Sequence, residues 1–295
     1  MNDRVIGFIG YGAMASLMGK NLVKAGYEVQ AYTPSGLVLG EKSPVPMLSS
    51  PREIAEKSDV IILCVPDDKA EQKLLEGENG LLAGLKKGQL VLDTSTVSPA
   101  WADQLAVLLR KHNVQSLDTP MSGSTPEAEK GELIMLAGGD DAVIDRAQPI
   151  LDCIGRITIR TGPSGSAARL KLVINGIMGA TLNVIAEAVS YGLAAGINRD
   201  ILYNSLQELA VISPHHKRKL KMAQNGSFPA QFPTRLMLKD MGLLLDAGQN
   251  TSATLLGMAV AAQALASSNV YHKDEDYSAL IGKMEKDLIC PDRTA

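Results

Sequence analysis

Residues 5–15 read VIGFIGYGAMA, and this stretch decides the fold of the first half of the chain. Its first five residues are mostly apolar, which predicts a short buried strand. Two glycines then predict a tight turn, and apolar residues at helical spacing follow as far as Ala25. Gly26 ends that pattern, and residues 28–32 predict a second strand. A strand, a glycine turn, a helix and a strand within about 30 residues form the context of the dinucleotide-binding fingerprint.

Each position of the glycine turn has a physical role in that fingerprint. Gly10 allows the tight turn, and Gly12 lets the backbone approach a pyrophosphate. The helix that starts at Ala13 and Met14 presents free N–H groups and a positive dipole end to the phosphates. Ala15 stands where a third glycine is usual, which the pattern allows because that position serves close packing of helix on strand. The alternative is a glycine-rich turn that binds nothing.

The end of the second strand bears on the choice of nicotinamide cofactor. An acidic residue there hydrogen-bonds the ribose 2′-hydroxyl of NAD, whereas an arginine accommodates the 2′-phosphate of NADP. Residues 32–36 read YTPSG and contain neither. Thr33 and Ser35 are able to donate to either ribose. Because no carboxylate is present to repel a 2′-phosphate, the sequence modestly favours NADP over NAD.

Strands and helices continue to alternate up to residue 162. Apolar runs predict strands over residues 60–65, 90–94, 115–119, 133–137 and 156–161. Such alternation predicts a doubly wound, mostly parallel sheet whose ligands bind at the carboxyl ends of the strands. Val65 ends the first of these strands, and polar or turn residues, among them Pro66 and Thr96, follow three of them. We therefore expect these three residues to contact the cofactor.

A long apolar stretch over residues 164–196 predicts one helix of about 30 residues, roughly 45 Å at 1.5 Å per residue. Ser164 or Ser166 is its predicted N-cap, and Gly196 is a good stop. The stretch is apolar around most of its circumference, so we expect the helix to be buried. Lys171 and Asn175 break the pattern and, being four residues apart, share one face.

The spacing of Lys171 and Asn175 admits two interpretations. Taken alone, it favours a lysine that reaches the surface beside a core asparagine. The alternative is a functional site, because a lysine on an apolar helix needs solvent, a partner or a substrate.

The pattern changes after the long helix. Periodic apolar runs over residues 201–209, 236–247 and 255–266 predict helices. A length of 295 residues also exceeds one typical core. We therefore predict a Rossmann domain over residues 1–162. An all-helical domain over residues 163–295 then includes the interdomain helix.

Composition argues against several classes of partner. The net charge is −3 and aromatic residues make up 4% of the chain, so neither a nucleic acid nor an anionic membrane surface is expected as partner. Asn175, Asn183 and Glu187 favour a core helix over a membrane span. Three widely spaced cysteines, Cys64, Cys153 and Cys290, fit neither a disulfide framework nor a metal site. With no signal peptide at the N-terminus, these features predict a cytoplasmic protein.

Five motifs together resemble those of the β-hydroxyacid dehydrogenase family, which includes 3-hydroxyisobutyrate dehydrogenases and the tartronate-semialdehyde and glyoxylate-type reductases. In chain order they are residues 7–26, 93–99, 118–139, 162–175 and 232–246. The resemblance covers nearly the whole chain. Five matches in the right order are far more specific than any one of them.

The resemblance implies an activity and a catalytic residue. Members of the family transfer a hydride reversibly between NAD or NADP and a short hydroxy acid or its semialdehyde. The family's catalytic lysine falls on Lys171, which implies a general acid/base at this position, and Asn175 would orient the substrate or the lysine. The resemblance also implies assembly as a homodimer or homotetramer.

It further implies roles for residues of both domains. Ser122 and the backbone N–H of Gly123 would bind the substrate carboxylate, and Thr96 would complete the pocket. Met14 would pack beside the nicotinamide. Lys239 would close over the cofactor or the substrate from the helical domain.

The chain departs from the family pattern at three positions. Ser124 stands where a second glycine is common, and its side chain would narrow the pocket or add a donor. Pro126 replaces a small residue. Pro34 stands where many NADP-using relatives carry arginine. These departures leave the substrate and the cofactor preference open.

Three alternatives share this fold. Imine reductases usually carry Asp or Tyr at the position of Lys171. A 6-phosphogluconate dehydrogenase normally has histidine at the position of Ile174, and its second domain is longer. A catalytically silent cofactor-binding interaction protein would keep the glycine turn and lose Lys171. The lysine therefore favours the hydroxyacid dehydrogenase interpretation.

Overall fold

A computed structural model describes residues 4–34 and 45–289 of the chain. Packing divides the chain into two units, Met1–Leu172 and Val173–Ala295. The division falls within the long helix, α8 (Ser166–Ala194), whereas the sequence places the domain boundary before that helix. The first turns of α8 therefore pack with the Rossmann unit.

The first unit is built on an eight-stranded sheet of order β2-β1-β3-β4-β5-β7-β6, with β8 on the other edge of β7. The strands are β1 (Val5–Ile9), β2 (Glu28–Tyr32), β3 (Val60–Leu63), β4 (Leu90–Asp93), β5 (Gln115–Asp118), β6 (Met121–Ser122), β7 (Leu133–Gly138) and β8 (Gly155–Gly162). The pairs from β2 to β5 are parallel, and β7 runs antiparallel to β5 and β6. The predicted doubly wound, mostly parallel sheet is thus confirmed.

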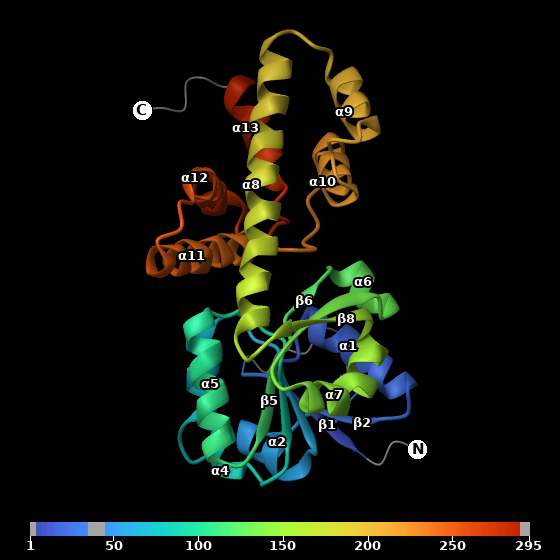
Figure 1. The fold of residues 1–295 in the computed structure, drawn as a ribbon. Coiled ribbons are helices and arrows are strands. Elements are labelled where there is room, and N and C mark those ends of the chain that lie inside the picture. Colours follow the sequence, from blue (N-terminus) through green and yellow to red (C-terminus); the bar gives the residue numbers. More distant parts are fainter. Residues whose placement is uncertain (1–3, 35–44, 290–295) are drawn as a thin grey trace. The chain divides into compact units, whose positions relative to one another are not determined.

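Helices cover both faces of this sheet (Figure 1). One face carries α1 (Ala13–Lys24), α6 (Thr125–Lys130) and α7 (Asp141–Ile154), and the other carries α2 (Pro51–Lys57), α3 (Asp68–Leu75), α4 (Leu81–Gly84) and α5 (Pro99–Lys111). Successive residues of β1 serve the two cores: Phe8 packs in one and Ile9 in the other. Burial on both faces explains why the strands read as continuous apolar runs.

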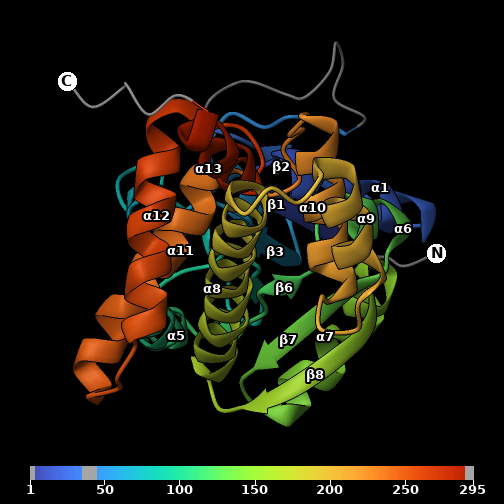
Figure 2. The same ribbon diagram turned by 90° about the horizontal axis from the view of Figure 1, so that it is seen from above.

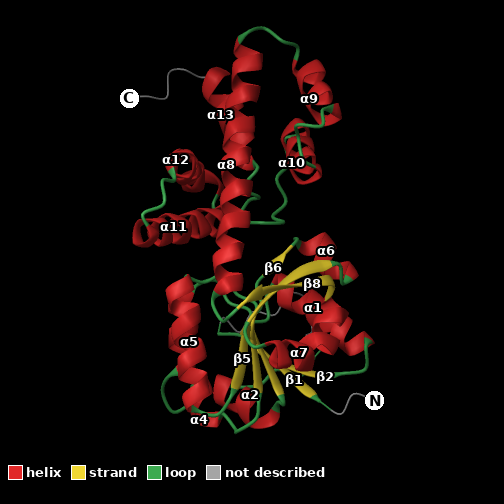
Figure 3. Cartoon of the chain, viewed as in Figure 1, coloured by secondary structure: helices red, strands yellow, loops and turns green. Residues whose placement is uncertain are grey.

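The second unit is helical, and every named strand of the described residues precedes α8 (Figure 3). After α8 come α9 (Arg199–Glu208), α10 (Pro214–Asn225), α11 (Thr234–Thr251), α12 (Leu256–His272) and α13 (Ala279–Ile289). In Figure 2, α9 and α10 lie on one side of the long helix, and α11 and α12 lie on the other. The predicted helices correspond to α9, α11 and α12, and the structure adds α10 and α13.

Glycines let α8 pack closely against its neighbours. A Cβ atom at Gly176 would lie 2.4 Å from Leu244 Cδ2, and one at Gly179 would lie 2.9 Å from the sulfur of Met241. Both contacts are shorter than any ordinary van der Waals distance. The small residues of α8 therefore set how near α11 approaches the long helix.

Burial of α8 differs from the expectation. Its apolar composition predicts a helix buried on most sides, yet Val173, Ile177, Val184 and Tyr191 are exposed. Among the described residues, α8 is the one helix long and apolar enough to cross a membrane by composition, and half of its apolar window is buried. The expected burial is therefore found on one side of α8. The four exposed residues form an apolar stripe that the described part of this chain does not cover.

Candidate active site

The glycine turn between β1 and α1 has the geometry that the fingerprint requires. Gly10 has a φ of +88°, and a Cβ there would lie 2.3 Å from the carbonyl oxygen of Cys64. A side chain is excluded at this position by both strain and contact. Gly12 is different, because a Cβ there would meet no atom within 4 Å. The turn therefore leaves open space in front of Gly12, where a pyrophosphate would approach.

The start of α1 completes this cradle. Gly12 is the N-cap residue and has no side chain with which to cap the helix. The N–H groups of Ala13 and Met14 are thus left for an anionic ligand, and the helix dipole favours negative charge there. The open space and the uncapped helix fit a dinucleotide.

Replacing Gly12 with Val is expected to weaken NADPH and NADH binding about 10- to 100-fold, or about 1.4–2.8 kcal/mol. A Cβ at this position meets no atom of the folded chain within 4 Å, so the added side chain would fill the space of the pyrophosphate. Fluorescence titration of the reduced cofactor measures the effect, and thermal melting serves as the control. A well-folded variant with unchanged affinity would contradict the assignment of this turn to the cofactor.

Two more loops follow neighbouring parallel strands and are tied together. Ser95, after β4, accepts a hydrogen bond at its Oγ from the backbone N–H of Val65, which follows β3, at 3.1 Å. The N–H of Ser95 in turn donates to Asp93 Oδ1 at 2.9 Å. Pro66 is exposed and Thr96 is half-buried. The predicted cofactor residues therefore lie at the carboxyl ends of adjacent strands.

The N-terminus of α8 is held by a residue that the sequence did not identify as its cap. Asp118, at the end of β5, accepts from Gly165 N at 2.8 Å and from Ala168 N at 3.0 Å. The predicted serine cap is wrong for Ser166, which lies inside the helix and bonds through its hydroxyl to Thr161 at 2.6 Å. Cap prediction relies on neighbours in sequence, and this cap comes from a distant strand.

This cap fixes the turn that precedes Lys171. Ala168 lies one turn before the lysine, and Lys171 is 8% exposed. The glycine at position 138 makes room for the carboxylate, because a Cβ there would lie 2.5 Å from Asp118 Oδ1. Asp118 thus joins the sheet to the helical turn that carries the lysine, so it acts on the site by positioning.

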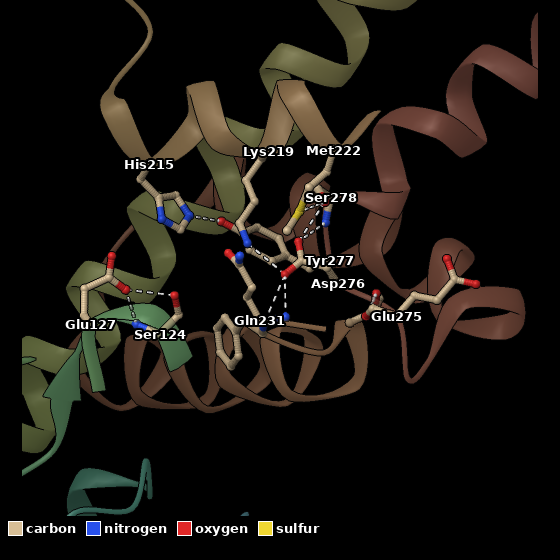
Figure 4. Close-up of polar contacts among 12 residues, drawn as sticks. Ser124, Glu127, His215, Lys219, Met222, Gln231, Glu275, Asp276, Tyr277 and Ser278 are labelled. Atoms are coloured by element: carbon tan, nitrogen blue, oxygen red, sulfur yellow. Dashed lines mark hydrogen bonds and ion pairs between the residues drawn. The ribbon is translucent and has the colours of Figure 1, made fainter. Parts of the chain in front are cut away.

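The predicted carboxylate-binding segment is folded differently from a simple glycine loop. Ser122 is half-buried at the end of β6, and Gly123 is exposed with a φ of +131°. The N–H and the hydroxyl of Ser124 both donate to Glu127, at 2.8 and 2.9 Å (Figure 4). Ser124 is the N-cap residue of α6, whose first turn accommodates Pro126. The Ser124 hydroxyl, which a glycine at this position would lack, therefore caps the start of α6.

In the helical unit, Asn175 belongs to a short chain of polar contacts. Its Nδ2 donates to Asp240 Oδ2 at 2.6 Å, and Asp240 Oδ1 forms an ion pair with Lys239 at 2.6 Å. Asn175 and Asp240 are buried, and Oδ1 of Asn175 has no hydrogen-bond partner among the described residues. Because a buried acceptor rarely stays unpaired, this oxygen suits a substrate or another donor.

Asp240 is the site residue that the sequence did not single out. Its position in the motif centred on Lys239 was the available signal. By taking one amide N–H, it fixes which way the Asn175 amide points. Lys171 belongs to the first unit and Asn175 to the second, and one turn of α8 separates them.

A buried ion pair holds the segment that leads into α11. Lys219 and Asp276 lie 2.8 Å apart, with side chains 1% and 0% exposed. Asp276 also accepts from the backbone N–H groups of Gln231 and Phe232, at 3.2 and 3.0 Å (Figure 4). The pair therefore fixes the chain just before the helix that carries Lys239 and Asp240.

His215 lies beside this pair and is excluded as an acid/base near neutral pH. Its Nε2 lies 2.6 Å from the hydroxyl of Tyr277. Burial, followed by the charge of Lys219, lowers the pKa of His215 to about 3. The imidazole is therefore neutral and structural.

A dinucleotide cradle at a strand end, followed by a helical unit, is typical of nicotinamide-cofactor oxidoreductases. Residues 5–162 match the family described as the NAD binding domain of 6-phosphogluconate dehydrogenase. Residues 165–284 match the family described as the NAD-binding domain of NADP-dependent 3-hydroxyisobutyrate dehydrogenase. The chain belongs to the β-hydroxyacid dehydrogenase family of NAD(P)-dependent enzymes.

Individual relatives agree along most of their length. The chain is 30% identical to glyoxylate/succinic semialdehyde reductase 2 of Arabidopsis thaliana, over 94% of this chain and 78% of the relative. It is 31% identical to the mitochondrial 3-hydroxyisobutyrate dehydrogenase of Rattus norvegicus, over 88% of this chain and 80% of the relative. A solved 3-hydroxyisobutyrate dehydrogenase of Mycobacterium tuberculosis with L-serine has a TM-score of 0.83 at 28% identity, covering 95% of this chain and 99% of that one.

Proposed function

We propose that this protein transfers a hydride between NAD(P) and a short 3-hydroxy acid or its semialdehyde, with Lys171 as general acid/base. The observation that carries the proposal is a buried lysine on the turn of α8 whose start Asp118 fixes. The names of the relatives, which are semialdehyde reductases and 3-hydroxyisobutyrate dehydrogenases, support the substrate class.

The chemistry follows from the charge that develops on the substrate oxygen. The reduced nicotinamide supplies the hydride to the carbonyl carbon. As the carbonyl oxygen gains negative charge, the Lys171 ammonium stabilises it and donates a proton. In alcohol oxidation the neutral amine accepts the hydroxyl proton instead.

Other groups bind and orient the substrate in this proposal. Ser122 and the N–H of Gly123 hold the carboxylate, and Thr96 completes the pocket. The unpaired Oδ1 of Asn175 accepts a hydrogen bond from the lysine or from the substrate hydroxyl. Lys239 contributes positive charge, which Asp240 partly balances.

A steady-state panel tests the substrate class. Glyoxylate, succinic semialdehyde, methylmalonate semialdehyde and tartronate semialdehyde would each be assayed with NADPH and NADH. We expect at least one to be reduced with a kcat/KM above about 10⁴ M⁻¹s⁻¹, the lower end for enzymes acting on their own substrates. Turnover of cyclic imines without turnover of any semialdehyde would favour the imine reductase alternative. Cofactor binding without any turnover would favour the silent protein.

We infer a modest preference for NADP, because Tyr32 and Thr33 at the end of β2 introduce no carboxylate. Ser35, the other predicted donor, lies outside the described residues. Thr33→Asp is expected to shift the ratio of kcat/KM toward NAD about tenfold, since the carboxylate accepts from the 2′-hydroxyl and repels the phosphate. Thr33→Asn, an uncharged control of the same shape, should shift it less. An unchanged ratio for the aspartate variant would contradict the assignment.

We also propose that the protein is a homodimer or homotetramer. The exposed stripe of α8 and the exposed Leu256, Val260, Val270 and Tyr271 of α12 support this, because apolar patches of this kind mark interfaces. A solution mass of one chain would contradict it.

The remaining partner and location proposals follow the composition. We propose that α8 is a core helix without a membrane partner, and that no nucleic acid binds. The free thiols of Cys64 and Cys153 support a reducing, cytoplasmic location, whereas Cys290 lies outside the described residues.

A further inference from the structure

We propose that Glu71 and Asp93 share one proton and thereby hold the loops after β3 and β4 in the arrangement that binds the cofactor. Glu71 lies on α3 and Asp93 ends β4, and both side chains are almost fully buried. Their carboxyl groups are in hydrogen-bonding contact with each other. The inference rests on the cofactor assignment of those loops and is independent of the substrate.

The donors around the pair are too few for two carboxylates. Trp101 Nε1 donates to Glu71 Oε2 at 2.6 Å, and Ser95 N donates to Asp93 Oδ1 at 2.9 Å. The Ser95 hydroxyl contacts both carboxyl groups but has one proton to give. Oε1 of Glu71 is buried, and no hydrogen bond from the described residues reaches it. A protonated Asp93 supplies the missing donor.

The electrostatic surroundings favour that proton. Asp68, on the first turn of α3, and the thiol of Cys64 are titratable groups beside the pair. Asp68 is acidic, and burial raises the pKa of Cys64 to about 11, so neither supplies positive charge. Two buried carboxylates in contact repel each other strongly, and one proton between them removes the repulsion.

The pKa shifts agree with this arrangement. Burial, and then the charge of Glu71, raises the pKa of Asp93 well above its usual 3.8. Burial likewise raises the pKa of Glu71 above 4.5. Because the two groups interact, the protein loses their protons in two steps, and the pKa of each step describes the pair and not one residue. The last proton leaves above the pH range in which exposed carboxyl groups titrate.

The pair is connected directly to the cofactor loops. Asp93 binds Ser95 N, and Ser95 Oγ binds Val65 N, so one contact chain joins the carboxyl pair to both loops. Loss of the shared proton places two negative charges against Ser95. We expect this to disturb Val65 and Thr96 and to weaken cofactor binding as the pH rises.

The chain contains its own probe for this titration. Trp101 is the only tryptophan of the sequence, and its indole N–H bonds to Glu71. Tryptophan fluorescence of the cofactor-free protein should therefore change in one step between about pH 4 and the tyrosine range near pH 10. In Glu71→Gln the step should leave this pH, because Asp93 then has no carboxylate beside it and ionises at lower pH. Asp93→Asn should shift the step in the same direction, because Glu71 likewise ionises at lower pH.

Glu76→Gln is the matched control. Glu76 is exposed and lines the same surface hollow as Trp101, but it does not contact the pair. This variant should keep the step. A step that persists unchanged in both Glu71→Gln and Asp93→Asn would overturn the shared proton, and so would the absence of any step in the wild type.

Cofactor titration tests the coupling separately. Wild-type affinity for NADPH should fall about fivefold or more as the pH crosses the fluorescence step, at the lower end of ordinary coupling between sites. Glu71→Gln should show the same affinity on both sides. A wild-type affinity that does not change across a clear fluorescence step would overturn the positioning role. Loss of NADPH binding at every pH in the wild type would instead contradict the cofactor assignment.

Stability gives a second readout that a simple packing role would not produce. An acid whose folded pKa is raised binds its proton more tightly in the folded state, so stability falls as pH rises from the unfolded value through the folded one. Asp93→Asn removes this loss. Its melting temperature relative to wild type should therefore increase with pH, and a constant difference would contradict the proposal.

Discussion

Replacing Lys171 with Ala is expected to lower kcat by about 10²–10⁴, the usual effect of losing a general acid/base. Cofactor binding and folding should change little, because the cradle at Gly10 and Gly12 lies elsewhere in the chain. The measurement is kcat for the best substrate of the panel, beside thermal melting and NADPH titration. A well-folded variant with near-normal kcat would end the claim that this lysine carries the chemistry.

A charge-preserving variant separates acid/base chemistry from simple electrostatic attraction. Lys171→Arg keeps the positive charge but stays protonated near neutral pH, so it cannot accept the proton of an alcohol. We expect alcohol oxidation to remain low in this variant. The wild-type rate of alcohol oxidation should rise with pH as the lysine loses its proton. This rise should be absent in both Lys171→Ala and Lys171→Arg. Full rescue by arginine would indicate that charge alone matters.

Replacing Lys219 with Ala is expected to lower the free energy of unfolding by about 3–5 kcal/mol, the cost of leaving one partner of a buried ion pair uncompensated. Asp276 is 0% exposed and would lose the ammonium that lies 2.8 Å away. Its backbone donors at Gln231 and Phe232 remain, so the loss should fall within that range. Urea unfolding followed by circular dichroism measures it.

The chain offers a surface ion pair as the control for this experiment. Lys57 and Glu53 lie 2.7 Å apart, four residues apart on α2, and the lysine side chain is 54% exposed. Lys57→Ala should cost about 0.3–0.5 kcal/mol, because water screens such a pair. Equal losses in the two variants would contradict the role of burial. Lys219→Met, which restores apolar packing but leaves Asp276 unpaired, should stay close to Lys219→Ala.

Features that depend on near neighbours could be predicted from the sequence. The strand bounds of β1 and β2 agree with the predicted residues 5–9 and 28–32. The family resemblance indicated Lys171 before any contact was visible. Local patterns suffice for these because strand burial, helix period and caps are set by residues a few positions apart.

Features that join distant segments could not be predicted in this way. The sequence showed polar residues after each strand but not their partners, so nothing marked Asp118 as the residue that caps α8. The exposed stripe of α8 was equally hidden, because apolar composition alone does not say whether this chain or another covers it. Long-range packing decides both.

The sequence by itself determined the Rossmann alternation and the glycine turn, because each is written in local periodicity or in a short motif, and the family resemblance added Lys171 as the candidate catalytic residue. Only the tertiary structure decided that Asp118 caps α8, that Asp240 orients Asn175 and that Glu71 contacts Asp93. In each of these pairs the partners are more than 20 residues apart in the chain. Their meeting depends on how the strands order themselves in the sheet and how helices pack, which no local pattern encodes.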